Sequence, residues 1–308
     1  MKPWHHYLRS ALFLVVVGTA WYLPRRAQRR LSAWTARFVH RLAPRLRRRI
    51  EKNLTRALCG EVAPAELRAS VRAVLTNYGN YVLDFLALSR GRSKDVQCSR
   101  RGEHHLRDAL ATRRGVILVT AHLGSWEMAA LFLADHAKSI TLVSRAEEIG
   151  YLGEMRSTIR SRLDHDELLV GKDPMAALAL LGRLRAGGMV GMQIDRAVGS
   201  SFLSVPFCGA RFRMPRGPAR LAHASEALVI PVFALFADDG GYELVVEPSI
   251  DPRGLTEAQI LARLAAVLER YVRSYPRQWL MMQDPWDDSP AAAKAADGER
   301  RDAVGTAP

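Results

Sequence analysis

The sequence predicts an α/β fold in which helices flank a mixed, mostly parallel sheet. Apolar, β-branched runs of strand length recur along the chain, and segments of helix-forming composition separate them. Such alternation is typical of a sheet covered by helices on its faces. With 308 residues, 48% of them apolar, the chain is long enough for one large domain with appendages.

The elements follow in order after an apolar and basic front. Apolar residues at helical spacing predict helices over 62–90, starting at Pro64. We expect strands over 96–99, 115–120, 140–145, 167–170, 189–194, 227–233 and 242–246. We expect further helices over 104–110, 127–136, 150–163, 174–186, 215–226 and 256–274. The chain thus divides into an anchoring segment (1–50), a main domain (51–288) and a disordered tail (289–308), which is Ala-rich, charged and interrupted by Gly and Pro.

The chain is strongly basic. Its net charge is +14, from 45 Lys and Arg against 31 Asp and Glu. Ten arginines and no acidic residue fall between Arg25 and Arg49. This excess predicts an anionic partner, which is nucleic acid, an anionic membrane or a phosphorylated substrate. The three cysteines are far apart, which argues against a zinc site or a disulfide framework and fits a reducing compartment.

An uncharged apolar run of 13 residues, 11–23, precedes the arginines. It is short for a spanning helix, which needs about 20 residues. A signal peptide with a cleavage site near Gly18-Thr19-Ala20 is one interpretation, although the arginines that follow disfavour translocation. A buried core helix is a second. We prefer a third, a helix embedded in the inner face of a membrane with the arginines on anionic head groups.

The arginine block interleaves with apolar residues near helical spacing, among them Trp34, Phe38 and Leu42. A basic amphipathic helix beside an apolar segment is typical of a membrane surface. No zinc finger, RRM-type aromatic motif or KH-type loop is present. We therefore expect an anionic membrane surface, and not nucleic acid, as the partner of this charge.

The main candidate for chemistry is the segment His122-Leu123-Gly124-Ser125-Trp126-Glu127. It lies where a predicted strand ends and a helix begins, and a tight turn at Gly124-Ser125 would let Glu127 fold back toward His122. A carboxylate on one imidazole nitrogen fixes the tautomer and makes the other nitrogen a better base for an alcohol. The alternative is that both residues merely cap a helix.

Charged residues also close other strands. Arg145 ends one predicted strand, and Asp195-Arg196 ends another. Ligands of open α/β sheets bind beyond the carboxyl ends of the strands, so these side chains could share one crevice with His122 and Glu127. Arginines there would bind phosphate or another acidic group.

These blocks together resemble the glycerolipid (lysophospholipid) acyltransferase superfamily. His122 to Glu127 is similar to its His-x4-Asp/Glu motif, in the form found in the late lipid A (lauroyl/myristoyl) and phosphatidylinositol mannoside acyltransferases. The other matching blocks, in order over about residues 30–286, are Thr141 to Arg145, Asp195-Arg196, Ser204-Val205-Pro206-Phe207-Cys208-Gly209, Val229-Ile230-Pro231-Val232 and Tyr275-Pro276-Arg277-Gln278-Trp279.

The resemblance implies acyl transfer from acyl-carrier protein or acyl-CoA to a hydroxyl of a membrane glycolipid, most simply a lipid A precursor. It implies no metal and no bound cofactor, and a location at the cytoplasmic face of the bacterial inner membrane. His122 would be the general base and Glu127 would orient it. The substrate-binding residues would be Arg145, Asp195, Arg196, Gly124 and Trp126, with both arginines binding phosphates that Asp195 helps to position.

Three departures from the family pattern put the acceptor in question. Ser125 replaces the usual Asn, Cys208 replaces a second Phe, and the stretch 211–216 is more basic than usual. A lysophospholipid or a mannosylated inositol lipid is therefore an alternative acceptor. A non-catalytic membrane- or nucleic-acid-binding protein is the alternative from another class.

Overall fold

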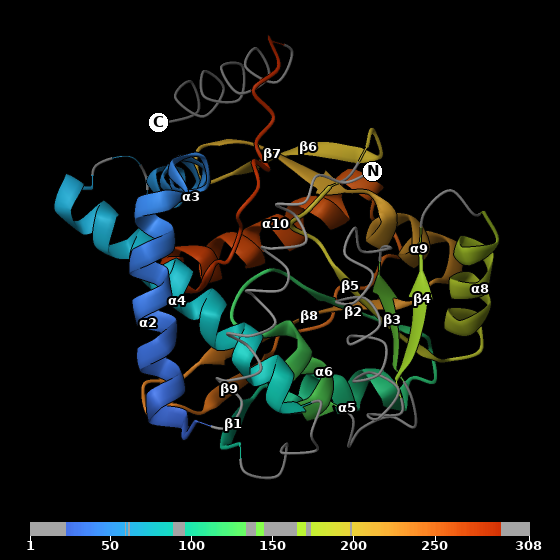
Figure 1. Cartoon of the computed structure of the whole chain (residues 1–308). Coiled ribbons are helices and arrows are strands. Elements are labelled where there is room, and N and C mark those ends of the chain that lie inside the picture. The colour runs from blue at the N-terminus through green and yellow to red at the C-terminus, as the bar shows by residue number, and fades with distance from the viewer. Residues whose placement is uncertain are drawn as a thin grey trace, which may run out of the picture.

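The computed structural model describes residues 23–58, 60, 62–88, 96–133, 140–144, 165–170, 174–197 and 199–290. At its centre is a seven-stranded sheet with the strand order β1-β9-β8-β2-β5-β3-β4 (Figure 1). Its strands are β1 (Cys98–Arg101), β2 (Val116–Thr120), β3 (Ile140–Ser144), β4 (Asp166–Leu169), β5 (Met189–Gln193), β8 (Leu228–Phe236) and β9 (Tyr242–Val246). The apolar run up to residue 22, the predicted helix 150–163 and the tail beyond residue 290 lie outside the described residues.

The pairing confirms a mixed, mostly parallel sheet. Strand β2 pairs in parallel with β5 on one side and β8 on the other, and β3 pairs in parallel with β5 and β4. Among the described strands of this sheet, β8 and β9 alone pair antiparallel, and β1 is parallel to β9 at the edge. We expected the strands that precede His122, Arg145 and Asp195 to end at one edge of the sheet. The parallel pairing of β2, β5 and β3 confirms this.

Helices cover both faces. In β2, Val116 and Leu118 point to one face, and Ile117 and Val119 to the other, as the two-residue period of a strand requires. The first face packs against α5 (Glu103–Ala111) and α6 (Trp126–Leu133). The second packs against α8 (Pro174–Arg185), α9 (Gly217–Ser225) and α10 (Glu257–Ser274). The fold is thus a three-layer α/β/α arrangement.

The arginine block forms two helices, α2 (Arg25–Leu42) and α3 (Pro44–Ala57), where a single basic amphipathic segment was expected. The break falls at Ala43 because Pro44 cannot continue the hydrogen bonds of α2 but fits the first turn of α3. Both helices pack against α4 (Pro64–Leu88), as Figure 1 shows at the left of the molecule. The predicted boundary at residue 50 falls inside α3. Within the described residues, no helix is long and apolar enough to cross a membrane.

A two-stranded hairpin, β6 (Phe202–Phe207) and β7 (Ala210–Pro215), was not predicted. Pro206 and the arginines of β7 obscured the strand pattern. The turn is formed by Cys208 and Gly209, with φ of 49° and 71°. Positive φ at both central residues is typical of the turns that close tight hairpins. The hairpin packs against α10, and its apolar face joins the core.

Candidate active site

His122 and Asp195 meet at the carboxyl ends of two neighbouring strands. Each residue lies two positions beyond its strand, and Thr120 of β2 is in register with Gln193 of β5. The imidazole Nδ1 of His122 lies 2.8 Å from Oδ1 of Asp195. The other carboxylate oxygen, Oδ2, accepts the backbone N–H of His122 at 2.8 Å. One carboxylate therefore fixes both the backbone and the ring of His122.

The burial of the two groups suits base catalysis. Asp195 is 0% exposed, whereas the His122 side chain is 16% exposed. With Nδ1–H donated to the carboxylate, the neutral imidazole has an unprotonated Nε2 that can accept a proton. A buried carboxylate also stabilises the imidazolium that forms when Nε2 is protonated. The pair has the parts of a general base.

The residue at Nδ1 differs from the sequence-based expectation. Glu127 was expected to orient His122, and Asp195 to position phosphates. Instead, the carboxylate bonded to Nδ1 is that of Asp195. Glu127 is buried in the first turn of α6. The parallel register of β2 and β5, which no local spacing encodes, decides this pairing.

The turn after His122 needs its glycine. Gly124 has φ of +63°, and a Cβ there would overlap the carbonyl oxygen of Ala234 in β8. The Ser125 N–H donates to that same carbonyl at 2.8 Å, and the Gly124 N–H donates to Gln278 at 3.0 Å. The role of Gly124 supported by these contacts is therefore to place the turn against β8.

Trp126 forms one wall beside the imidazole. Its ring meets the His122 ring edge-on, with the centroids 4.9 Å apart. It also packs against Tyr81 of α4, with the ring centroids 4.0 Å apart. Trp126 thus links the His122 turn to α4, the helix that follows the arginine block.

Of the two arginines predicted to bind phosphate, Arg145 and Arg196, the structure describes Arg196. Arg196 directly follows Asp195 and is exposed, so its guanidinium is available to an anionic ligand. Arg145 lies outside the described residues. Ser125 is 1% exposed, and within the described part of the chain its hydroxyl has no hydrogen-bond partner.

The closing segment around Trp279 contributes a site residue that sequence reasoning missed. The Trp279 indole N–H donates to Oδ2 of Asp195 at 3.1 Å, and Trp279 is 2% exposed. The Leu280 N–H donates to the His122 carbonyl at 2.6 Å. The available signal was the block Tyr275-Pro276-Arg277-Gln278-Trp279, which resembles the closing element of the superfamily but by itself indicates no role for Trp279.

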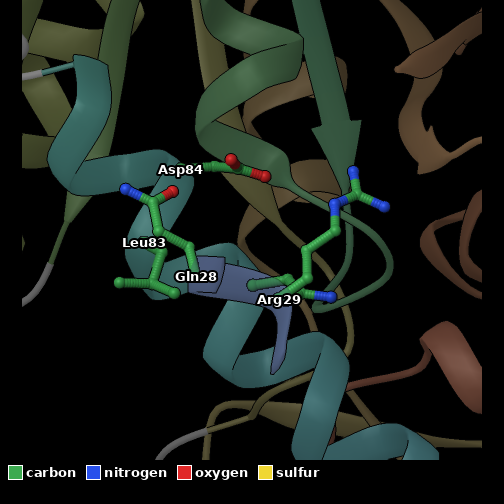
Figure 2. A pocket seen from close by; sticks show the side chains of 5 residues that line it. Gln28, Arg29, Leu83 and Asp84 are labelled. Carbon is green, nitrogen blue, oxygen red and sulfur yellow. The ribbon is translucent and has the colours of Figure 1, made fainter. Parts of the chain in front are cut away.

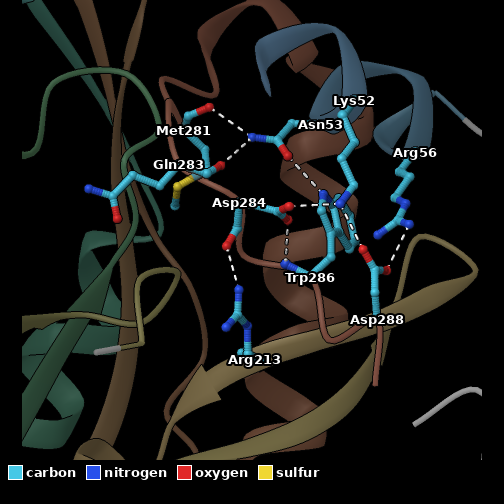
Figure 3. Close-up of polar contacts among 9 residues, drawn as sticks. All are labelled: Lys52, Asn53, Arg56, Arg213, Met281, Gln283, Asp284, Trp286 and Asp288. Atoms are coloured by element: carbon cyan, nitrogen blue, oxygen red, sulfur yellow. Dashed lines mark hydrogen bonds and ion pairs between the residues drawn. The ribbon is translucent and has the colours of Figure 1, made fainter. Parts of the chain in front are cut away.

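The segment after Trp279, residues 280–288, forms a C-terminal strap held by α3 (Figure 3). The Asn53 amide donates to the carbonyls of Met281 and Gln283 at 2.9 and 2.8 Å, and its oxygen accepts the Trp286 indole N–H at 2.7 Å. Lys52 bonds to the carboxylates of Asp284 and Asp288 at 2.7 Å each. The Lys52 ammonium lowers the pKa of Asp288. The strap is therefore tied to α3 by buried and exposed polar contacts.

A small pocket lies away from this site. Figure 2 shows it between α2 and α4, lined by Gln28, Arg29, Asn80, Leu83 and Asp84. Its cavity volume is only about 10 Å³, far below the range of about 300–1,000 Å³ usual for small-molecule sites. It includes neither His122 nor Asp195, so we do not assign it to the reaction. Among the described residues, no cluster of His, Cys, Asp and Glu could hold a metal ion.

Comparisons with known proteins place the chain among acyltransferases. The family model of the bacterial lipid A biosynthesis acyltransferases matches residues 2–287, and the chain belongs to this family of acyltransferases. The chain is 29% identical over 243 residues to a phosphatidylinositol mannoside acyltransferase of Mycobacterium tuberculosis, covering 77% of this chain and 76% of the relative. It is 30% identical over 240 residues to the protein of the same name from Mycolicibacterium smegmatis, with the same coverage.

Proposed function

We propose that this acyltransferase moves a fatty acyl chain from acyl-carrier protein or acyl-CoA to a hydroxyl of a membrane glycolipid, with His122 as general base. The observation that carries the proposal is the buried Asp195 carboxylate on Nδ1 of His122, at the carboxyl edge of the sheet. The family of acyltransferases to which the chain belongs supplies the reaction class.

The steps follow from the geometry of the pair. Nε2 of His122 takes the proton of the acceptor hydroxyl as its oxygen attacks the thioester carbonyl. The resulting tetrahedral intermediate then collapses, the carbon–sulfur bond breaks, and the thiolate receives the proton from the imidazolium. Asp195 stabilises the imidazolium between these two steps. The products are the acylated lipid and the free thiol of the carrier.

The acceptor we put first is a lipid A precursor, as the family's description suggests. A mannosylated phosphatidylinositol is the second candidate, because the relatives carry that substrate in their names. Both are anionic glycolipids with free hydroxyls. The exposed Arg196 next to Asp195 is suited to the phosphate of either one.

The proposal places the enzyme on the cytoplasmic face of the inner membrane. On α2, Trp34, Phe38 and Leu42 are 61%, 56% and 64% exposed and recur every four residues, so they form one apolar ridge. Exposed Arg30, one turn before Trp34, shares this ridge, and exposed Arg37 and Arg41 lie beside it. An apolar ridge flanked by arginines suits the interface of an anionic bilayer.

Lipid mass spectrometry of a deletion strain tests the function, because it reveals which lipid loses one acyl chain. In parallel, the purified enzyme is given acyl-carrier-protein and CoA thioesters with a lipid A precursor or with a phosphatidylinositol mannoside. We expect one acceptor to gain an acyl chain, and His122→Ala to abolish this transfer.

His223→Ala, at an exposed histidine of α9, is the matched control and should retain activity. Transfer by folded His122→Ala would overturn the role of His122. Salt-dependent DNA binding with no transfer to any lipid extract would favour the non-catalytic alternative.

A further inference from the structure

The Asp195 carboxylate accepts hydrogen bonds from three donors, which belong to two residues. Two of them, the backbone N–H and the ring Nδ1–H, belong to His122. The third is the Trp279 indole N–H, and it comes from the closing segment, not from the sheet. Oδ2 is shared between Trp279 and the His122 backbone, so Trp279 holds the carboxylate oxygen that does not face the imidazole.

We propose that Trp279 is a positioning residue for acyl transfer: its indole N–H fixes the Asp195 carboxylate in the orientation that aligns the His122 imidazole. This inference rests on the proposed function of His122. Trp279 contacts neither the proposed donor nor the acceptor in this role, and it acts through Asp195.

Trp279 is itself held rigidly. The Gln278 side chain makes two hydrogen bonds to the backbone of Phe236, at 2.8 and 2.9 Å. On the other side of Trp279, the Leu280 N–H donates to the His122 carbonyl. Backbone contacts on both sides therefore fix the indole relative to the turn that carries the base.

Trp286 offers a natural comparison. It is also 2% exposed, its indole N–H is also bonded to a buried side chain, and its ring lies 6.2 Å from that of Trp279. Its partner is Asn53, however, and not Asp195. The two tryptophans share one aromatic cluster, and only Trp279 touches the proposed catalytic machinery.

Loss of the Trp279 donor should change the electrostatics as well as the geometry. A carboxylate with one donor fewer is a stronger acceptor, and it interacts more strongly with an imidazolium. The acidic limb of the pH profile of kcat/KM should therefore move to higher pH. A purely structural loss would lower the amount of active enzyme without moving this limb.

The test compares Trp279→Phe with Trp286→Phe, each in the full chain and each checked for folding by thermal unfolding. Both variants keep an aromatic ring and lose one buried N–H. We expect Trp279→Phe to lower kcat about tenfold, to leave KM within twofold and to shift the acidic limb. Trp286→Phe should lose a similar amount of stability with kcat within about twofold of the parent. Equal kinetic effects of the two variants, or an unshifted limb in Trp279→Phe, would overturn the proposal.

A second measurement uses the unsubstituted protein and needs no substrate. The indole N–H resonance of Trp279 should titrate with the same midpoint as the ring protons of His122, because Asp195 bridges them. The Trp286 resonance should not follow this titration. If the chemical shift of the Trp279 indole N–H does not change as His122 ionises, the proposal is overturned. Since this readout does not depend on acyl transfer, its failure is distinguishable from failure of the proposed function.

Discussion

Asp195 holds His122 at two points, since Oδ2 accepts its backbone N–H and Oδ1 faces its ring Nδ1, both at 2.8 Å. The backbone contact fixes where the turn leaves β2, and the ring contact fixes the direction of the imidazole. This double contact depends on the adjacency of β2 and β5 in the sheet.

We predict that Asp195→Asn lowers kcat by about 100- to 10,000-fold, the range seen when a histidine base loses its orienting carboxylate. An amide has a single acceptor oxygen for the three donors and no charge for the imidazolium. Acyl-transfer kinetics measure the effect, with circular dichroism to confirm folding. The comparison is Glu127→Gln, which removes the charge of the buried carboxylate within the segment from His122 to Glu127. A larger loss of kcat in Glu127→Gln than in Asp195→Asn would return the orienting role to Glu127.

The sequence was sufficient to predict most elements and the place of His122 just beyond the end of a strand. The strand before His122 and the one before Asp195 are short, continuous apolar runs. Such runs indicate buried strands without information from the rest of the chain. That both residues lie at one edge follows from the rule for parallel sheets. The predicted α/β architecture is therefore confirmed.

The carboxylate partner of His122 was not predictable in the same way. Glu127 is close to His122 in sequence, whereas Asp195 becomes a neighbour only because β5 inserts between β2 and β3. Trp279 is more distant still, and its contact depends on the closing segment crossing the turn at Leu123. Contacts of this kind are set by strand order and by packing, which local periodicity does not encode.

We predict that Gly124→Ala destabilises the fold by about 3 kcal/mol or more. Left-handed backbone costs a residue with a Cβ about 1–2 kcal/mol, and the added overlap with the Ala234 carbonyl forces the turn away from β8. Gly209→Ala is the matched control, because Gly209 has φ of +71° but no atom within 4 Å of the added Cβ. Urea unfolding should give a loss of about 1 kcal/mol for Gly209→Ala. Equal losses would show that the overlap has no cost.

We predict that Asn53→Ala costs about 3 kcal/mol of stability, because it leaves the carbonyls of Met281 and Gln283 and the Trp286 indole N–H without their partner. Lys52→Ala, one residue earlier on α3, removes two exposed ion pairs and should cost only about 0.5 kcal/mol. Urea unfolding of both variants measures the difference. Losses of similar size would contradict a dominant role for the buried amide.

We expect the free energy of unfolding to depend on pH through the ion pair that joins the start of β2 to the loop before α10. Arg114 makes a two-point contact with Asp251, at 2.6 and 2.9 Å, and this lowers the pKa of Asp251 from 3.8 to about 2. A depressed pKa stabilises the folded state above the unfolded value, and this contribution fades as the pH falls from about 4 to about 2. The stability difference between the parent and Asp251→Asn should therefore shrink over this interval. A difference that stays constant down to pH 2 would contradict the assignment.

The exposed ridge of α2 gives a prediction about membrane binding. Replacing Trp34, Phe38 and Leu42 by Ser should weaken binding to anionic vesicles about 100-fold or more, because three large apolar side chains no longer enter the interface. Met175→Ser with Leu178→Ser is the control, since these α8 residues are 64% and 58% exposed but belong to a different surface.

The arginines of α2 at the apolar ridge should contribute to membrane binding independently of the apolar side chains. Replacing Arg30, Arg37 and Arg41 by Gln should weaken binding to anionic vesicles about 100-fold, at about 1 kcal/mol for each arginine. Binding to zwitterionic vesicles should change little, because no head-group charge is lost there. Vesicle co-sedimentation of the full-length variants measures both effects. If the α8 variant lost as much binding as the ridge variant, or if the arginine variant lost as much binding to zwitterionic vesicles as to anionic ones, α2 would not be the docking surface.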